Sequence, residues 1–118
     1  RPRSRRGREG AGPAGLPTAF TAPPSAPAPP PGWPAPLAAL WWLAHDPSGP
    51  ASAAWDRAHR LVQDAAGPDA AWVHAHLHRI EGDDGNARYW YGRAGQPGPH
   101  GTLAQERAAL VGALFKPI

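Results

Sequence analysis

Apolar residues recur every three to four positions between residues 36 and 115, which is the spacing of one face of an α-helix. Glycine, proline or aspartate interrupts the pattern at four places, so it predicts five helices. The positions predicted to face the core are, helix by helix, Leu37, Leu40, Trp41 and Ala44; Ala54, Trp55, Ala58, Leu61, Val62 and Ala65; Val73, Leu77 and Ile80; Ala87, Trp90, Tyr91 and Ala94; and Leu103, Leu110, Val111 and Leu114.

The residues around the four interruptions predict where each helix begins and ends. Glycine is favoured where a helix exits in the left-handed conformation, as predicted at Gly82. Charged residues of the last helix, Glu106 and Arg107, are expected on its outside. The predicted N-terminal residues are Pro36 in the first turn of the first helix, Ser48 or Gly49 before Pro50, Asp69, Asp83 or Asp84, and a capping box from Thr102 to Gln105.

These elements predict an all-α fold of two antiparallel helical hairpins and a closing C-terminal helix. The only stretch with alternating apolar and polar residues, 74–79, is flanked by helical patterns and is interpreted as helix. Two hairpins are few for an independent stack, so residues 103–115 are expected to act as a lid over the second hairpin. We predict one helical domain, residues 35–118.

Residues 1–34 are expected to form a disordered arm, because an arginine cluster is followed by a tract of almost only alanine and proline. The arm holds five arginines and one glutamate, a net charge of +4, whereas residues 35–118 hold seven basic and eight acidic residues, a net charge of −1. The high isoelectric point therefore belongs to the arm. The folded part gives no basic face for nucleic acid, and binding beyond weak contacts of the arm is not expected.

Composition limits compartment and chemistry. Without cysteine there is neither a disulfide framework nor a thiolate metal site, and a reducing cytoplasm is the expected location. The longest apolar run, residues 37–44, is about half of what a bilayer span needs, so no membrane partner is expected. Glycine loops for phosphate, a serine elbow and a cysteine nucleophile are also missing from the sequence.

The second and fourth predicted helices repeat one pattern at an offset of twenty-nine residues: Ala58, Val62 and Ala65 correspond to Ala87, Tyr91 and Ala94. Small residues at these positions let paired helices approach closely. With Gly82 and Pro99, this spacing resembles the tetratricopeptide and Sel1-like helical repeats over residues 36–100. His74 and Ala75 stand where such repeats usually carry Leu-Gly. The resemblance implies a scaffold that binds a protein or peptide, with a small molecule also possible.

Residues 72–95 resemble more closely the core of a group of small bacterial proteins that have no assigned function. The shared pattern is W-[VI]-H-A-x-L-H-R-x-E-G-D-x-x-N-A-x-Y-W-Y-x-R-A-G. The chain departs from it at Gly92, where that group favours a better helix former. The resemblance implies no activity. The matching residues are Trp72, His74, Ala75, Leu77, His78, Arg79, Glu81, Gly82, Asp83, Asn86, Ala87, Tyr89, Trp90, Tyr91, Arg93, Ala94 and Gly95.

A group of polar residues flanks the apolar faces of the third and fourth helices. His74, His78 and Glu81 fall within about 60° of one another on a helical wheel, and Arg79 points away. A tight hairpin could bring this rim against polar residues of the next helix. The candidate ligand-binding residues are His74, His78, Glu81, Asn86, Tyr89 and Arg93.

Three interpretations of this cluster stay open. In the first, the residues are structural: Glu81 and Asp83 pair with Arg93 or cap the fourth helix, and the histidines hydrogen-bond to tyrosine or backbone. In the second, they line a pocket. In the third, His74, His78 and Glu81 bind one divalent metal, because two imidazoles and a carboxylate form a known ligand set. Water or substrate would fill the remaining positions, with Tyr89 and Arg93 orienting an anionic group.

Among the other histidines, His76 is expected to be a packing residue near Trp72, while His45, His59 and His100 lack a carboxylate-rich context. Ala75 occupies the position where a zinc protease would carry its catalytic glutamate, which excludes that reaction. The sequence therefore predicts a small helical interaction module first, and second an enzyme that uses the polar cluster of the 72–94 hairpin, with or without a divalent metal ion.

Overall fold

A computed structural model describes residues 20, 27–46, 49, 52–99 and 101–115. Within these residues the fold is all-α and contains no strand, which confirms the predicted fold class. None of the helices in the described ranges combines the length and the apolar character needed to cross a membrane. The helices are α2 (Ala35–His45), α3 (Ala53–Gln63), α4 (Pro68–Ile80), α5 (Asp84–Ala94) and α6 (Leu103–Leu114).

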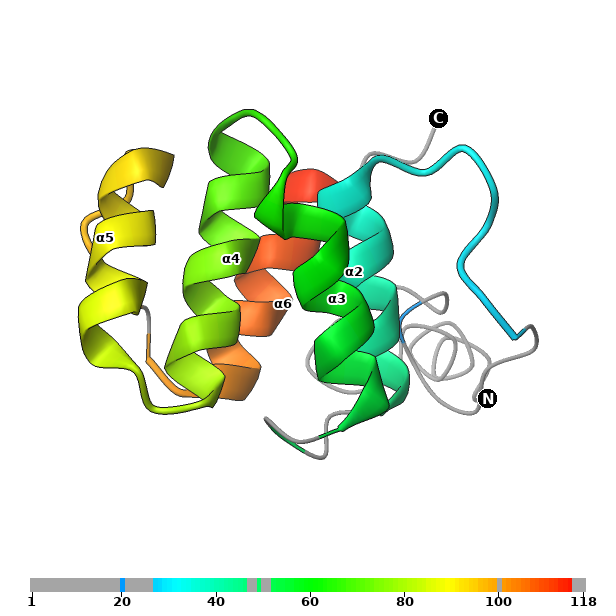
Figure 1. Ribbon diagram of the computed structural model, residues 1–118, viewed down its shortest axis with the longest axis horizontal. Helices are drawn as coiled ribbons and strands as arrows, with labels where there is room; N and C mark the ends of the chain where they lie inside the picture. Colours follow the sequence, from blue (N-terminus) through cyan, green and yellow to red (C-terminus); the bar gives the residue numbers. More distant parts are fainter. Residues whose placement is uncertain (1–19, 21–26, 47–48, 50–51, 100, 116–118) are drawn as a thin grey trace, which may run out of the picture.

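Helix α4 is at the centre of the molecule. It contacts α5 on one side and α3 on the other, while α6 lies behind it and α2 lies behind α3 (Figure 1). The α2–α3 and α4–α5 pairs are the two hairpins. Helix α6 contacts α2 and α4, one helix of each hairpin. It therefore joins the two hairpins, whereas the sequence predicted a lid over the second hairpin.

The main core lies between α2, α3, α4 and α6, and a smaller apolar cluster lies between α4 and α5. Ala75 and Ala87, both buried, let α4 and α5 approach closely, and the Tyr91 side chain fills the space beside them. The Trp55 indole Nε1 donates to the Leu77 carbonyl at 3.0 Å, which ties α3 to α4. Fully buried side chains of the main core include Leu40, Leu43, Val62, Val73, Leu77, Leu110 and Val111.

The ends of α5 and α6 follow the predicted chemistry. The Asp83 carboxylate accepts from the Asn86 backbone N–H at 3.2 Å, which caps α5. The Thr102–Gln105 capping box of α6 is present. Gly82 has the predicted positive φ, 81°, at the hairpin corner. These three features confirm the predicted corner of the second hairpin and the predicted starts of α5 and α6.

The predicted starts of α3 and α4 were wrong. Helix α3 begins at Ala53 because the Ser52 hydroxyl accepts from the Trp55 N–H at 3.0 Å, so Ser52, not Ser48 or Gly49, is the N-cap; Ser48 itself lies outside the described residues. Helix α4 begins at Pro68 with Gly67 as N-cap, and Asp69 lies inside the first turn. Proline suits that first position, since its missing N–H would be unpaired there anyway.

The disorder predicted for residues 1–34 falls mostly outside the described residues. Phe20 is an exception, with 2% of its surface exposed. Its ring stacks on Trp33 at 5.6 Å and meets Phe115 edge-on at 5.4 Å, so it belongs to the main core. The sequence pattern did not include Phe20 among the core residues, because it stands alone in a proline- and alanine-rich segment.

Candidate metal centre

Helix α4 carries two histidines stacked one turn apart. His74 and His78 are four residues apart, so their side chains project from the same face of the helix. Their ring centroids lie 4.9 Å apart with an angle of 24° between the planes. Only 4% of His74 and 9% of His78 is exposed to solvent, so this face of α4 is covered by its neighbours.

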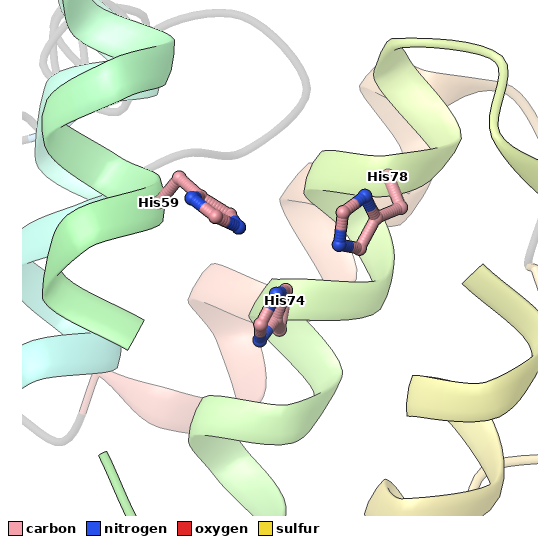
Figure 2. A group of neighbouring side chains, drawn as sticks. All are labelled: His59, His74 and His78. Carbon is pink, nitrogen blue, oxygen red and sulfur yellow. The ribbon is translucent and has the colours of Figure 1, made fainter. Parts of the chain in front are cut away.

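A third histidine reaches the pair from α3. The His59 ring centroid is 4.9 Å from that of His74 and 5.6 Å from that of His78, and the His59 plane is nearly perpendicular to both (Figure 2). Trp55 lies one turn before His59 and stacks on its ring at 5.0 Å. Because the Trp55 indole is itself hydrogen-bonded to α4, it holds His59 facing that helix. We call His59, His74 and His78 the histidine cluster.

Helix α5 forms one wall of the histidine cluster. The Trp90 indole stacks on the His74 ring at 4.0 Å with 17° between the planes. Trp55 and Trp90 therefore flank two of the three imidazoles with flat aromatic surfaces. Such packing limits ring rotation and excludes water, two conditions that a pre-organised ligand site needs.

Two histidines of the cluster, His59 and His74, favour the neutral state. Burial, and then the neighbouring His59 and His78, lower the pKa of His74 to about 4. Burial and His78 also lower the pKa of His59, against the opposing effect of Glu81 and Asp56. Neutral imidazole is the form that binds a metal ion, so His59 and His74 need to release no proton for binding near pH 7.

The spacing of the cluster suits one metal ion. One nitrogen from each of His59, His74 and His78 lies within 4.8 Å of the other two. Zinc–nitrogen bonds of about 2.0–2.1 Å in tetrahedral geometry place the ligand nitrogens about 3.4 Å apart. Side-chain rotations that move the ring nitrogens by about 1 Å would therefore complete the site. The buried Nδ1 of His74 has no hydrogen-bond partner among the described residues, and such an atom is costly unless something binds it.

Glu81, predicted as the third metal ligand, lies beside His78. Its Oε2 accepts a hydrogen bond from the His78 Nδ1 at 2.6 Å, and 30% of its side chain is exposed. The nitrogen Nε2 of His78 is then the one left for a ligand. A carboxylate in this position orients a metal-binding imidazole and raises its basicity. Glu81 also groups with His78 and Asp83, but the Asp83 carboxylate is already engaged as the cap of α5.

The predicted site residues of α5 do not join the histidines by hydrogen bonds. The Asn86 side chain donates to Asp83 Oδ2 at 2.8 Å, and the Arg93 Nη1 donates to the Tyr89 hydroxyl at 3.2 Å. All three residues are exposed. Helix α5 meets the histidine cluster through Trp90, whose ring also lies 5.7 Å from the Arg93 guanidinium carbon. The expected pairing of Glu81 with Arg93 is not among the ion pairs of the described residues.

His76, on another face of α4, belongs to a separate buried network. Its Nδ1 donates to Glu106 Oε1 at 2.7 Å, and both side chains are fully buried. The Tyr91 hydroxyl donates to Glu106 Oε2 at 2.5 Å and the Arg79 Nη1 to Oε1 at 3.1 Å. Arg79 also donates to the Gly101 carbonyl. We call these residues the Glu106 network; it links α4, α5 and α6.

The Glu106 network corrects one prediction. Glu106 was expected outside but is fully buried, and Arg79, which points away from the histidine rim as predicted, donates to it. Burial raises the pKa of Glu106, but the hydrogen bonds from His76 and Tyr91 outweigh that effect and bring it to about 2. Burial lowers the pKa of His76. A charged Glu106 held by Arg79 and two neutral donors is therefore a structural anchor, which agrees with the packing role predicted for His76.

His59 is the residue that the sequence reasoning missed. It had been set aside because no carboxylate stands near it in the sequence. Its helical position carried a signal, since His59 shares a face of α3 with Trp55 and Val62, which are both buried. A histidine on a buried face needs a partner, and here its neighbours are two further histidines.

Comparison with known proteins adds nothing to these observations: no protein-family model, no curated protein and no solved structure matches the chain.

Proposed function

We propose that the protein binds one divalent transition-metal ion through His59, His74 and His78. The observation that carries this proposal is the convergence of three imidazoles from two helices, two buried and one half-buried, with ligand nitrogens within 4.8 Å of one another. Imidazole is a preferred ligand of zinc, copper, nickel and iron, and no thiolate is present to compete.

The alternative, a structural role for the three histidines, accounts less well for their contacts. The structural histidine of this protein, His76, donates its Nδ1 to the Glu106 carboxylate, although its buried Nε2 has no hydrogen-bond partner among the described residues. In the histidine cluster the carboxylate of Glu81 engages only His78, and the buried Nδ1 of His74 has no partner in the described part of the chain. A metal ion would supply the interaction that the cluster lacks.

Three neutral ligands would leave the ion with its full charge and with a fourth position free. Zinc sites with three protein ligands hold water or substrate in that position, whereas structural sites use four. The ion would then polarise whatever ligand it held. A site of this kind can sense, store or activate a small ligand, and it is compatible with the enzyme predicted as the second function.

The experiment is calorimetric titration of untagged, metal-free protein with ZnCl₂ and CoCl₂. We expect one ion per chain for the wild type. His59→Ala, His74→Ala and His78→Ala should each abolish binding, because two remaining imidazoles hold an ion weakly. His45→Ala, which removes a histidine outside the cluster, is the matched control and should bind one ion normally.

The interaction role stays a prediction. Tyr89, 55% exposed, is the large apolar residue that stands out on the described surface. Single exposed apolar residues are normal on proteins that dock nothing, so this one residue does not mark an interface. Helical shape alone does not favour a partner, and the metal-binding proposal does not require one.

A further inference from the structure

A pocket of about 340 Å³ lies close to the histidine cluster. It is formed by the C-terminal end of α3, the α3–α4 connection, the start of α4, and residues Trp90 and Arg93 of α5. The same three helices that surround the histidine cluster thus surround this pocket. Its volume is that of a small organic molecule.

Along α3 and α4 the pocket lies about one helical turn from the histidine cluster. On α3, Gln63 follows His59 by four residues; on α4, Ala71 precedes His74 by three. On α5, Arg93 follows Trp90 by three. One turn of helix advances about 5.4 Å. Because α4 runs antiparallel to α3 and α5, all three of these one-turn displacements lead toward the same end of the three helices. Trp90 belongs to both layers, since it stacks on His74 and lines the pocket.

The charges of the pocket favour an organic carboxylate. Arg93 supplies a cation that forms no ion pair among the described residues, and its side chain donates a hydrogen bond to the Tyr89 hydroxyl. A guanidinium has five N–H donors in a planar fork that matches a carboxylate. Asp64 also lines the pocket and would repel a doubly charged group, which disfavours phosphate.

From this arrangement, and resting on the metal site proposed above, we infer that the pocket binds a small organic carboxylate whose other polar end occupies the free position of the metal ion. Arg93 binds the carboxylate, and the Trp90 ring forms the wall along which the body of the ligand lies. The distance of about one helical turn between the two layers requires polar ends separated by about 5 Å, as in a four-carbon dicarboxylate.

The test uses the cobalt-loaded protein, because the visible absorption of Co²⁺ changes when its ligands change. Succinate, with two carboxylates, is compared with acetate, which can occupy the metal but cannot reach Arg93. We expect succinate to bind about tenfold more tightly than acetate, the effect of one charge-assisted hydrogen-bond pair. Arg93→Gln should remove this difference and leave Co²⁺ affinity unchanged. Arg88→Gln, an exposed arginine of the same helix outside the pocket, should keep the difference.

The outcomes separate this inference from the metal-binding proposal. Cobalt binding with equal affinities for succinate and acetate would overturn the carboxylate pocket and leave the metal site standing. A succinate preference that persists in Arg93→Gln would also overturn it. Failure of the wild type to bind Co²⁺ would overturn both proposals.

Discussion

Two groups of histidines on one helix differ in how their polar atoms are satisfied. His76 donates to a carboxylate that also accepts from a tyrosine and an arginine, so that side of α4 is a hydrogen-bonded network, although the buried Nε2 of His76 has no partner among the described residues. His74 and His78 meet each other and His59, three groups of the same chemistry. Burial alone therefore does not separate the structural histidine from the proposed ligands, and the identity of their partners is the difference between the two groups.

The two groups also respond differently to charge. The Glu106 network keeps an ionised carboxylate in the interior because donors converge on it. The histidine cluster lowers the pKa of His59 and His74, so a proton on either ring is disfavoured. Replacing residues in the first group should therefore cost stability, and replacing those in the second should cost metal binding.

The largest expected effect is in the Glu106 network. Glu106→Gln removes the negative charge that accepts hydrogen bonds from Arg79, His76 and Tyr91. The Arg79 guanidinium then has no carboxylate to pair with. Breaking a buried ion pair in this way lowers the free energy of unfolding by about 3 kcal/mol. Urea unfolding of the metal-free variant would measure it. A loss below that of an ordinary surface substitution would mean that the network is not an anchor.

The second effect is a pH dependence of the free energy of unfolding, caused by His74. Its pKa is about 4 in the folded state, against an ordinary histidine value of 6.5, so as the pH falls the unfolded chain binds this proton first. The contribution to stability is complete above pH 6.5 and is lost as the pH falls toward 4, by about 2 to 3 kcal/mol. Urea unfolding of metal-free wild type and His74→Phe at several pH values isolates it. Identical profiles for the two proteins would contradict this origin.

A third and smaller effect concerns Glu81. Removing its charge by Glu81→Gln weakens the hydrogen bond that orients His78, and we expect metal affinity to fall about tenfold, the lower end for such carboxylates because the side chain is partly exposed. Asp84→Asn makes the same change in charge at an exposed carboxylate away from His78 and serves as the control. Loss of all binding in Glu81→Gln would instead make Glu81 a direct ligand.

The smallest effect is on the stability of the metal-free protein when the cluster loses a histidine. His74→Phe keeps a flat ring against Trp90 and removes a buried nitrogen that has no partner, so stability should be unchanged or rise by about 1 kcal/mol. The same variant should lose the stabilisation that excess ZnCl₂ gives the wild type, about 2.7 kcal/mol at one hundred times the dissociation constant. A thermal melt with and without ZnCl₂ measures both.

The helices could be predicted from the sequence because each apolar stripe reports which face is buried. The caps at Asp83 and Thr102 were found because a short polar side chain can reach the first free N–H groups of its own helix. The start of α3 was missed because Ser48 and Ser52 both precede the stripe, and local chemistry does not choose between them.

The site was only partly predictable, because the residue pattern on one helix face does not indicate which neighbouring helix that face contacts. His74 and His78 were recognised from their shared face, and their partner was sought on the next helix, α5. The partner came from α3, the preceding helix, which packs on the other side of α4. Glu106 was placed outside because it is charged, although it shares a helical face with Leu103 and Leu110.

The most direct measurement for the central claim is nuclear magnetic resonance of the histidine ring nitrogens in ¹⁵N-labelled protein, before and after one equivalent of ZnCl₂. We expect one nitrogen each of His59, His74 and His78 to move to a metal-bound shift, with His78 binding through Nε2 while Nδ1 keeps its hydrogen bond to Glu81. The rings of His45 and His76 should not change. Unchanged spectra of His59, His74 and His78, or binding through only two of them, would contradict the three-histidine site.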